Sequence, residues 1–147
     1  MYHGTVAVQR TLNVPVAHAY NAFSDANERA KWGAPSDNAA AFIYEEANFK
    51  IGGRDLARCG PKDDPRFTIE AHYVDIVPER RVVWVEMVHE IDRLLAVNIT
   101  TLEFFSNGDA TELKVTVQVT SFVGPDMIKN TRAGHEGALS KMARYLE

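Results

Sequence analysis

The sequence predicts an α+β protein in which a curved antiparallel sheet of about six to seven strands surrounds a long C-terminal helix. Three observations support this prediction. Alternating apolar and polar residues fill most of the chain, two short helical segments follow the first alternating segment, and an amphipathic segment comes last. We expect residues 1–147 to form a single domain, because no linker rich in Pro, Gly or Ser divides a chain that is long enough for one core.

The first part of the chain is predicted to contain one strand and two short helices. Residues 5–14 alternate and are rich in β-branched side chains, and Pro15 ends the strand. Apolar residues then take helical spacing over residues 15–25, and the Ser-Asp pair at the end of this segment can cap a second short helix that runs to Trp32. The turn-forming residues of 33–38 predict a loop.

Six further strands are predicted, each bounded by turn-forming residues. They cover residues 42–49, 54–60, 67–77, 82–90, 96–105 and 111–122. Gly52 and Gly53 form a tight turn before the second of them. Most of the connections are short, and strands joined by such turns pair as antiparallel neighbours.

The last segment, Pro125 to Glu147, is predicted to be one amphipathic helix. Its apolar stripe contains a histidine, and the stripe consists of Ile128, His135, Leu139, Met142 and Leu146. An apolar helix face has to be covered, and the preceding sequence is mostly strand. We therefore expect His135 to point into the space between the helix and the sheet.

Composition and charge restrict the classes of partner. The net charge is −4 with both signs dispersed, so the basic stripe that nucleic acid requires is missing. No apolar run approaches the roughly twenty residues of a membrane span, and the N-terminal segment alternates, which makes a cytoplasmic location the default expectation. Cys59 is the single cysteine, and the five histidines lack metal-ligand spacing. We expect no metal site and no bound cofactor.

Several segments together resemble a known family. They are the strand exit, first helix and tryptophan turn at residues 14–23 and 31–35, the Gly-Gly turn at 48–54, the Ile-Val-Pro-Glu-Arg segment within 73–80, and Gly-His-Glu-Gly-Ala-Leu at 134–139. In this order they resemble the helix-grip fold of START and Bet v 1-like domains, the SRPBCC superfamily. Within it, they are similar to the group related to the C-terminal domain of the activator of the Hsp90 ATPase. The resemblance covers nearly the whole chain.

The chain departs from this family's pattern at three places. The terminal helix has His135 where the family usually has tryptophan, and the fifth strand has Glu86 where a second aromatic residue usually follows Trp84. The strand after the Gly-Gly turn has small or polar residues where aromatic side chains usually point inward, namely Asp55, Ala57 and Cys59. These differences predict an interior with more room and with polar groups that need partners when buried.

From these departures we predict a cavity between the terminal helix and the sheet that binds a small, partly hydrophobic or aromatic molecule with a polar handle. The predicted wall consists of Phe23, Trp32, Ala57, Cys59, Trp84, Phe104, Leu139 and Met142. The predicted polar groups are Asp55, Glu86 and His135.

Two alternatives concern the same polar residues. One is an enzyme of the cyclase, dehydratase or isomerase type, as in polyketide cyclases, with His135, Glu86 and Asp55 as catalytic acid or base. The other is a structural network in which one of the carboxylates holds His135 or Arg58. Tyr73 and Arg58 would face the same space, unless a bulge near residues 75–76 reverses their side.

Two further expectations concern protein partners. The family resemblance by itself implies a chaperone-associated role, with Hsp90 as the partner. Ile91, Leu94 and Leu95 are expected at a strand connection, where they are compatible either with a homodimer contact or with a lid over the cavity.

Overall fold

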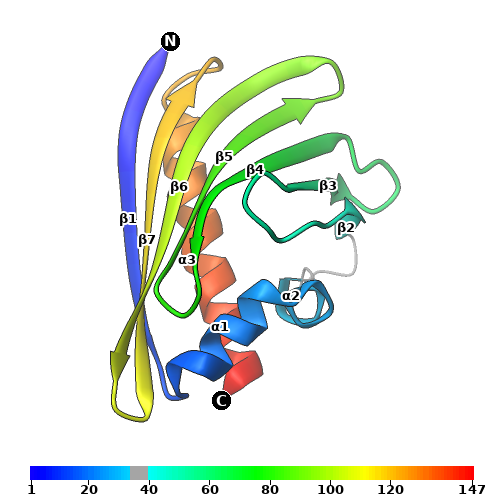
Figure 1. Ribbon diagram of the computed structural model, residues 1–147. Helices are drawn as coiled ribbons and strands as arrows, with labels where there is room; N and C mark the ends of the chain where they lie inside the picture. The colour runs from blue at the N-terminus through cyan, green and yellow to red at the C-terminus, as the bar shows by residue number, and fades with distance from the viewer. Residues whose placement is uncertain (34–39) are drawn as a thin grey trace.

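The computed structural model describes residues 1–33 and 40–147, and over these residues seven antiparallel strands form one sheet curved around a long helix (Figure 1). The elements are, in chain order, β1 (Tyr2–Leu12), α1 (Val16–Ser24), α2 (Ala26–Gly33), β2 (Ala40–Glu46), β3 (Arg54–Pro61), β4 (Phe67–Val77), β5 (Arg81–Glu90), β6 (Arg93–Asn107), β7 (Ala110–Ser121) and α3 (Asp126–Leu146). The strand order is β1-β7-β6-β5-β4-β3-β2, so the two strands that flank the short helices in sequence form opposite edges. This is the predicted fold class.

The core lies between the concave face of the sheet and the helices. Strand β7 shows how alternation of apolar and polar residues produces this core. Its inner face is at most 3% exposed and consists of Leu113, Val115, Val117 and Val119, which alternate with polar residues on the outer face. On α3 the buried residues near the C-terminus are Leu139, Met142 and Ala143. The apolar stripe predicted for the last helix thus faces the sheet.

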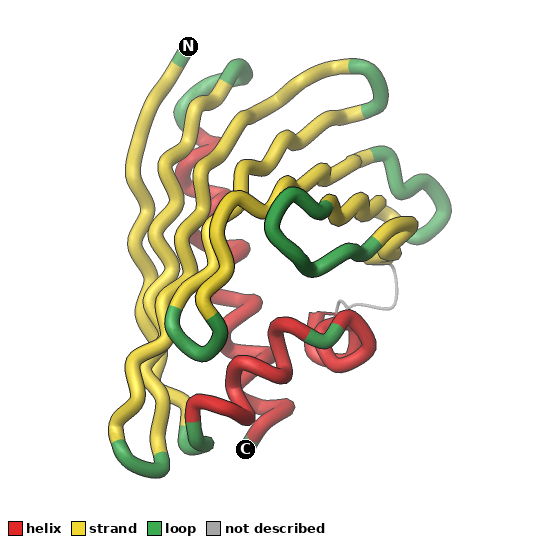
Figure 2. The backbone as a smooth tube through the Cα atoms, viewed as in Figure 1, coloured by secondary structure: helices red, strands yellow, loops and turns green. Residues whose placement is uncertain are grey.

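Helix α3 lies across the sheet, and the two short helices close one end of the space beneath it (Figure 2). Gly4 on β1 allows close packing of the first turn of α3, since a Cβ atom there would lie 2.9 Å from Ile128 Cδ1. None of the helices within residues 1–33 and 40–147 is long and apolar enough to cross a membrane.

Several element boundaries differ from the sequence-based expectation. Strand β1 covers residues 2–12, whereas 5–14 was expected, and β2 covers 40–46, whereas 42–49 was expected. The shift in β2 has a physical cause: its register with β3 is irregular between Tyr44 and Glu46, after which the chain leaves the sheet. Of the predicted loop 33–38, Gly33 ends α2 and the other residues lie outside the described part of the chain.

The prediction that three apolar residues form a connection between strands is wrong for two of them. Leu94 and Leu95 belong to β6, and Leu95 is buried. Only Ile91 of the three lies in the turn between β5 and β6, where it adopts a φ of 55° and is exposed. Extended pairing of β5 with β6 up to Glu90 and Arg93 explains the difference, because it leaves a turn of two residues.

Candidate functional site

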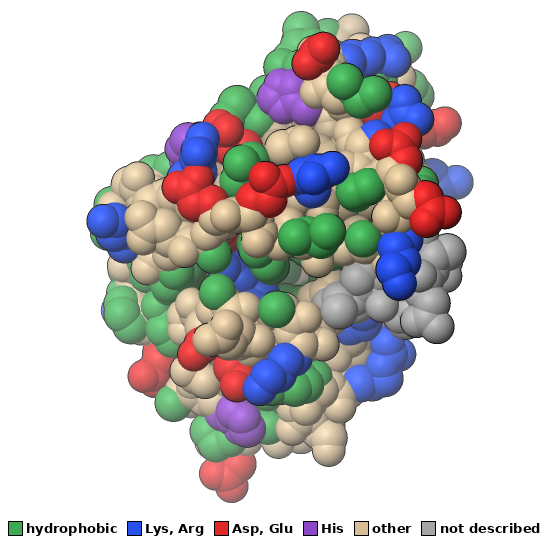
Figure 3. Space-filling model, turned by 90° about the vertical axis from the view of Figure 1, so that its right-hand side faces the viewer, with side chains coloured by type: hydrophobic (Ala, Val, Ile, Leu, Met, Phe, Trp, Pro, Cys, Tyr) green, Lys and Arg blue, Asp and Glu red, His purple; other side chains and the backbone are tan. Residues whose placement is uncertain are grey.

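A cavity of about 430 Å³ lies between the concave face of the sheet, α2 and α3. Figure 3 shows the molecule from the side of β2, β3 and α2, where the surface is hollowed between the strands and the helices, with hydrophobic side chains along its margin. Most of the predicted site residues line this cavity: Phe23, Trp32, Asp55, Ala57, Trp84, Glu86, His135, Leu139 and Met142.

Two predicted wall residues lie elsewhere. Phe104 is buried in the core, where its ring packs edge-on against Tyr20 at a centroid distance of 5.6 Å. Cys59 is half-buried near the end of β3, opposite Phe42 and Phe67 on the neighbouring strands. Neither residue is among the described residues that line the cavity. Burial, with a smaller contribution from Glu86, raises the pKa of the Cys59 thiol, which therefore stays protonated.

A row of aligned residues forms part of the cavity floor. Across β3, β4, β5 and β6, the register pairs Asp55 with Ala71, Ala71 with Glu86, and Glu86 with Asn98. All four residues line the cavity. Neighbouring strands lie about 4.8 Å apart, so the backbones that carry the two carboxylates are separated by roughly 10 Å. Ala71 lies between them, and its small side chain leaves this space unfilled. The cavity therefore has two separate polar regions.

The first polar region surrounds Asp55, which is 6% exposed. Its carboxylate forms an ion pair with Arg29 on α2 at 3.1 Å (Nη1 to Oδ2) and accepts hydrogen bonds from the Tyr73 hydroxyl and from the Asn48 backbone N–H at 3.0 Å. The same Arg29 nitrogen donates to the Tyr73 hydroxyl at 2.8 Å. Asp55 is thus held in a buried network whose positive charge comes from Arg29.

The guanidinium of Arg29 also lies over two aromatic rings, 5.3 Å from the centroid of Phe23 and 4.9 Å from that of Tyr44. Burial by itself lowers the pKa of Arg29, but Tyr44, Tyr73 and Asp55 outweigh this effect and raise it. Burial, together with the hydrogen bond to Asp55, raises the pKa of Tyr73. Arg29 is therefore charged and Tyr73 is a neutral hydroxyl. The Arg29 Nε and Nη2 atoms are buried without a hydrogen-bond partner among the described residues.

The second polar region surrounds Glu86 on β5. Its carboxylate accepts hydrogen bonds from Asn98 Nδ2 at 3.2 Å and from Trp84 Nε1 at 3.4 Å. Both donors are neutral, and within the described part of the chain Glu86 forms no ion pair. Asn98 is 3% exposed, and its Oδ1 atom is buried without a partner. This region is therefore rich in acceptors.

His135 of α3 lines the cavity. Burial lowers the pKa of this imidazole from its ordinary value of 6.5, and the negative charge of Glu86 offsets only part of the effect. No hydrogen bond of the His135 ring occurs within residues 1–33 and 40–147. The ring is therefore neutral near pH 7, with one nitrogen able to accept and the other able to donate a hydrogen bond.

The structural network proposed from the sequence exists with different members. Asp55 pairs with Arg29 and Tyr73, and neither carboxylate is hydrogen-bonded to His135. Arg58 lies on the outer face of β3, where it pairs with Glu45 at 3.3 Å. The bulge on β4 falls between Tyr73 and Asp75, so it comes after Tyr73 in the strand. Tyr73 therefore keeps its inward direction, and its hydroxyl reaches Asp55.

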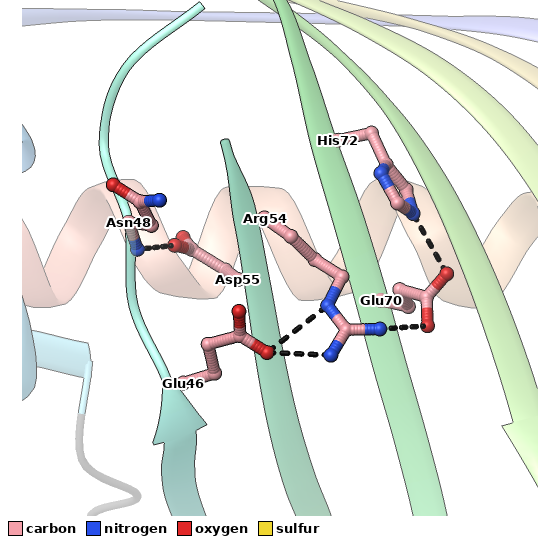
Figure 4. Close-up of polar contacts among 6 residues, drawn as sticks. All are labelled: Glu46, Asn48, Arg54, Asp55, Glu70 and His72. Atoms are coloured by element: carbon pink, nitrogen blue, oxygen red, sulfur yellow. Dashed lines mark hydrogen bonds and ion pairs between the residues drawn. The ribbon is translucent and has the colours of Figure 1, made fainter. Parts of the chain in front are cut away.

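Figure 4 shows how sharply the two faces of β3 differ. Arg54 bridges Glu46 and Glu70 on the outer face, with Glu46 at 2.6 Å and Glu70 at 3.3 Å, and His72 contacts Glu70 at 2.7 Å. The adjacent Asp55 points the other way, toward the backbone of Asn48. Strand alternation thus separates a solvated ion-pair chain from the buried network. In the described part of the chain, no three His, Cys, Asp or Glu side chains gather as a metal site would require.

The sequence-based prediction missed Arg29, Tyr44 and Asn98, which all line the cavity. Signals for two of them were present. Arg29 precedes the predicted wall residue Trp32 by three positions on one helix, so the two share a face. Asn98 is in phase with the buried Leu102 along β6.

Comparison with known proteins confirms the fold. The Mll3558 protein from Rhizobium loti is 28% identical, with a TM-score of 0.88, over 99% of this chain and 98% of that chain. An uncharacterised protein from Rhizobium leguminosarum is 22% identical, with a TM-score of 0.82, over 99% and 95% of the two chains. Protein CV1439 from Chromobacterium violaceum is 21% identical, with a TM-score of 0.83, over 97% and 96%. Among curated proteins, none matches this sequence.

The family is shown by a model that covers most of the chain. The model described as Activator of Hsp90 ATPase homolog 1-like protein matches residues 13–147, from the end of β1 to the end of α3. This range contains the Gly-Gly turn, both polar regions of the cavity and all of the helix that carries His135. This chain therefore belongs to the family of Activator of Hsp90 ATPase homolog 1-like proteins.

Proposed function

We propose that this protein binds a small, partly hydrophobic molecule in the cavity between α3 and the sheet. The observation that carries the proposal is a cavity of about 430 Å³ with mostly apolar walls and a few polar atoms that lack partners. Small-molecule sites commonly have volumes of about 300–1,000 Å³ and combine apolar walls with a few polar groups. The fold of this family is compatible with such a role.

In this proposal the apolar part of the ligand lies against Trp32, Trp84 and Leu139, which line the cavity from a helix, a strand and the terminal helix. The aromatic walls favour a flat or ring-containing body. The polar handle lies over the gap at Ala71, between the two polar regions. Ala57 and Ala71 leave the room that larger side chains at these positions would fill.

A thermal-shift panel tests the proposal. Naphthalene-sized compounds with acid, alcohol, ketone or amine groups are added to the protein, and at least one class should raise the unfolding temperature in a concentration-dependent manner. The Ala71→Leu variant narrows the cavity and should abolish this shift. Ala133→Leu makes the same change on the exposed face of α3 and should preserve it. A panel without any shift, or a shift that Ala71→Leu leaves unchanged, would contradict binding in this cavity.

His135 supports acid–base catalysis on the bound molecule as a second candidate. A neutral imidazole without a hydrogen-bond partner in the described structure can take a proton from a hydroxyl or from a carbon next to a carbonyl group. If this occurs, a compound from the panel is converted to a product that chromatography separates. The His135→Phe variant should then still bind the compound but not convert it; conversion at an unchanged rate in this variant would remove His135 from the mechanism.

A further inference from the structure

Glu86 and Asp55 occupy the same row of the sheet but differ in charge balance. Asp55 is neutralised by Arg29 at 3.1 Å, whereas Glu86 has only the neutral donors Trp84 and Asn98 within the described structure. Both carboxylates line one cavity with largely apolar walls. An ionised carboxylate that is partly removed from water favours a cationic partner, and this protein supplies none to Glu86 within the described residues.

The Asn98 amide places beside Glu86 a second acceptor without a partner in the described structure. Because a carboxylate only accepts hydrogen bonds, the neighbouring amide has to present its NH₂ group to Glu86, as it does at 3.2 Å. The amide oxygen then points away from Glu86, and it is buried without a partner. Asn98 itself is 3% exposed. A second acceptor is thus left unused beside the first.

His135 brings a third group to the same region from the opposite wall. It lines the cavity on α3, and its ring lies close enough to Glu86 for the carboxylate charge to act on its pKa. As a neutral ring it offers one further acceptor nitrogen. Negative charge and open acceptors therefore meet here, and an anionic group placed beside Glu86 would be repelled.

We propose that the preferred ligand of this cavity carries a protonated amine that binds Glu86. This rests on the proposed function and specifies the ligand class. An ammonium group supplies both the positive charge that Glu86 lacks and several N–H donors for Glu86 and the His135 ring. The adjacent Trp84 ring adds a favourable surface for a cation. The ammonium group lies at the Glu86 end of the gap at Ala71, and the apolar body of the amine extends toward the aromatic walls.

A series of three probes with the same body tests the inference in the unmodified protein. Naphthylmethylamine, naphthylmethanol and naphthoate differ mainly in the charge and hydrogen bonding of the head group. Calorimetric titration should show that the amine binds roughly tenfold or more tightly than the alcohol, as expected for a hydrogen bond to a charged group. Naphthoate should bind most weakly of the three.

The Glu86→Gln variant removes the charge and keeps the size of the side chain. It should reduce amine affinity to about that of the alcohol, while alcohol affinity changes by less than about threefold. Glu112→Gln makes the same charge change at an exposed position of β7 and should leave the amine preference intact. If Glu86→Gln does not fold, the order of the three probes in the unmodified protein still decides the question.

Different outcomes separate the two proposals. Equal binding of the amine and the alcohol, tighter binding of naphthoate, or an amine preference that survives Glu86→Gln would overturn the amine inference and leave small-molecule binding in place. If none of the three probes binds, the amine inference fails, and the wider thermal-shift panel then decides whether the proposed function fails with it.

Discussion

Asp55 shows how one buried carboxylate depends on residues from three elements. Arg29 of α2 provides the opposite charge, the Tyr73 hydroxyl of β4 donates a hydrogen bond, and the Asn48 backbone N–H in the loop before β3 donates another. The Arg29 and Asp55 side chains are 6% and 8% exposed. Removing one partner of such a pair leaves an uncompensated buried charge, which costs more than the pair itself contributes.

Replacing Arg29 by Met should therefore lower the free energy of unfolding by about 3–5 kcal/mol. The double variant Arg29→Met/Asp55→Leu should recover part of this loss, because no buried charge remains. Urea unfolding of the single and double variants measures both effects. Arg58→Met, which breaks an exposed pair with Glu45, serves as the control and should cost less than about 1 kcal/mol. Similar losses for Arg29→Met and Arg58→Met would contradict the buried network.

At the scale of an element, the Gly-Gly turn before β3 places Asp55 by docking on β4. The Gly52 N–H donates to the Tyr73 carbonyl at 2.9 Å, and the Tyr73 N–H donates to the Gly53 carbonyl at 3.0 Å. Gly52 has a φ of 81°, and a Cβ added to it would have no atom within 4 Å, whereas a Cβ on Gly53 would lie 2.2 Å from the Asn48 carbonyl oxygen. One glycine is required for its dihedral angle and the other for close packing.

These two causes predict different penalties for the same substitution. Gly52→Ala should cost about 1–2 kcal/mol, the strain of the left-handed region. Gly53→Ala should cost about 3 kcal/mol or more and should also weaken ligand binding, because the backbone around Asn48 has to move. Thermal unfolding measures the difference. Asparagine tolerates the left-handed region, so Gly52→Asn should be milder than Gly52→Ala; equal losses for Gly52→Ala and Gly53→Ala would refute the packing argument.

For the whole molecule, wrapping the sheet around α3 is what partly removes His135 from water. The pKa of the ring is lowered in the folded state, so the unfolded chain binds the proton at higher pH than the folded chain does. Stability associated with the neutral ring is complete above the ordinary pKa of 6.5 and is lost as the pH falls below it. The pKa values of the Glu28 and Glu70 carboxyl groups are also lowered, but these two groups change the stability only below their ordinary pKa of 4.5.

Chemical denaturation between about pH 7.5 and about pH 5.5 should therefore show a falling free energy of unfolding, and the fall should be smaller in His135→Gln. His18→Gln removes an exposed histidine of α1 and should keep the acid sensitivity of the unmodified protein. If His135→Gln and the unmodified protein lose stability in parallel over this range, the folded state does not disfavour protonation of His135.

The fold was predictable because its signals are local. Alternation identified the seven strands, helical spacing identified the three helices, and the family resemblance implied that Ala57, Glu86 and Asp55 face inward. Boundaries were less predictable. The end of β2 depends on its irregular pairing with β3, and the start of β6 depends on how far β5 continues to pair with it. Such pairing involves residues that are distant in sequence.

The sequence by itself determined the order of the elements, the inward-facing positions, and the presence of His135 on the apolar stripe of α3. Only the tertiary structure decided how the polar residues are matched. Arg29 reaches Asp55 because α2 packs over the strand that carries it, and Glu86 is left without a cation because its sheet neighbours are Ala71 and Asn98. The physical reason is that residue periodicity sets the direction of a side chain, whereas charge partners are set by register and helix packing.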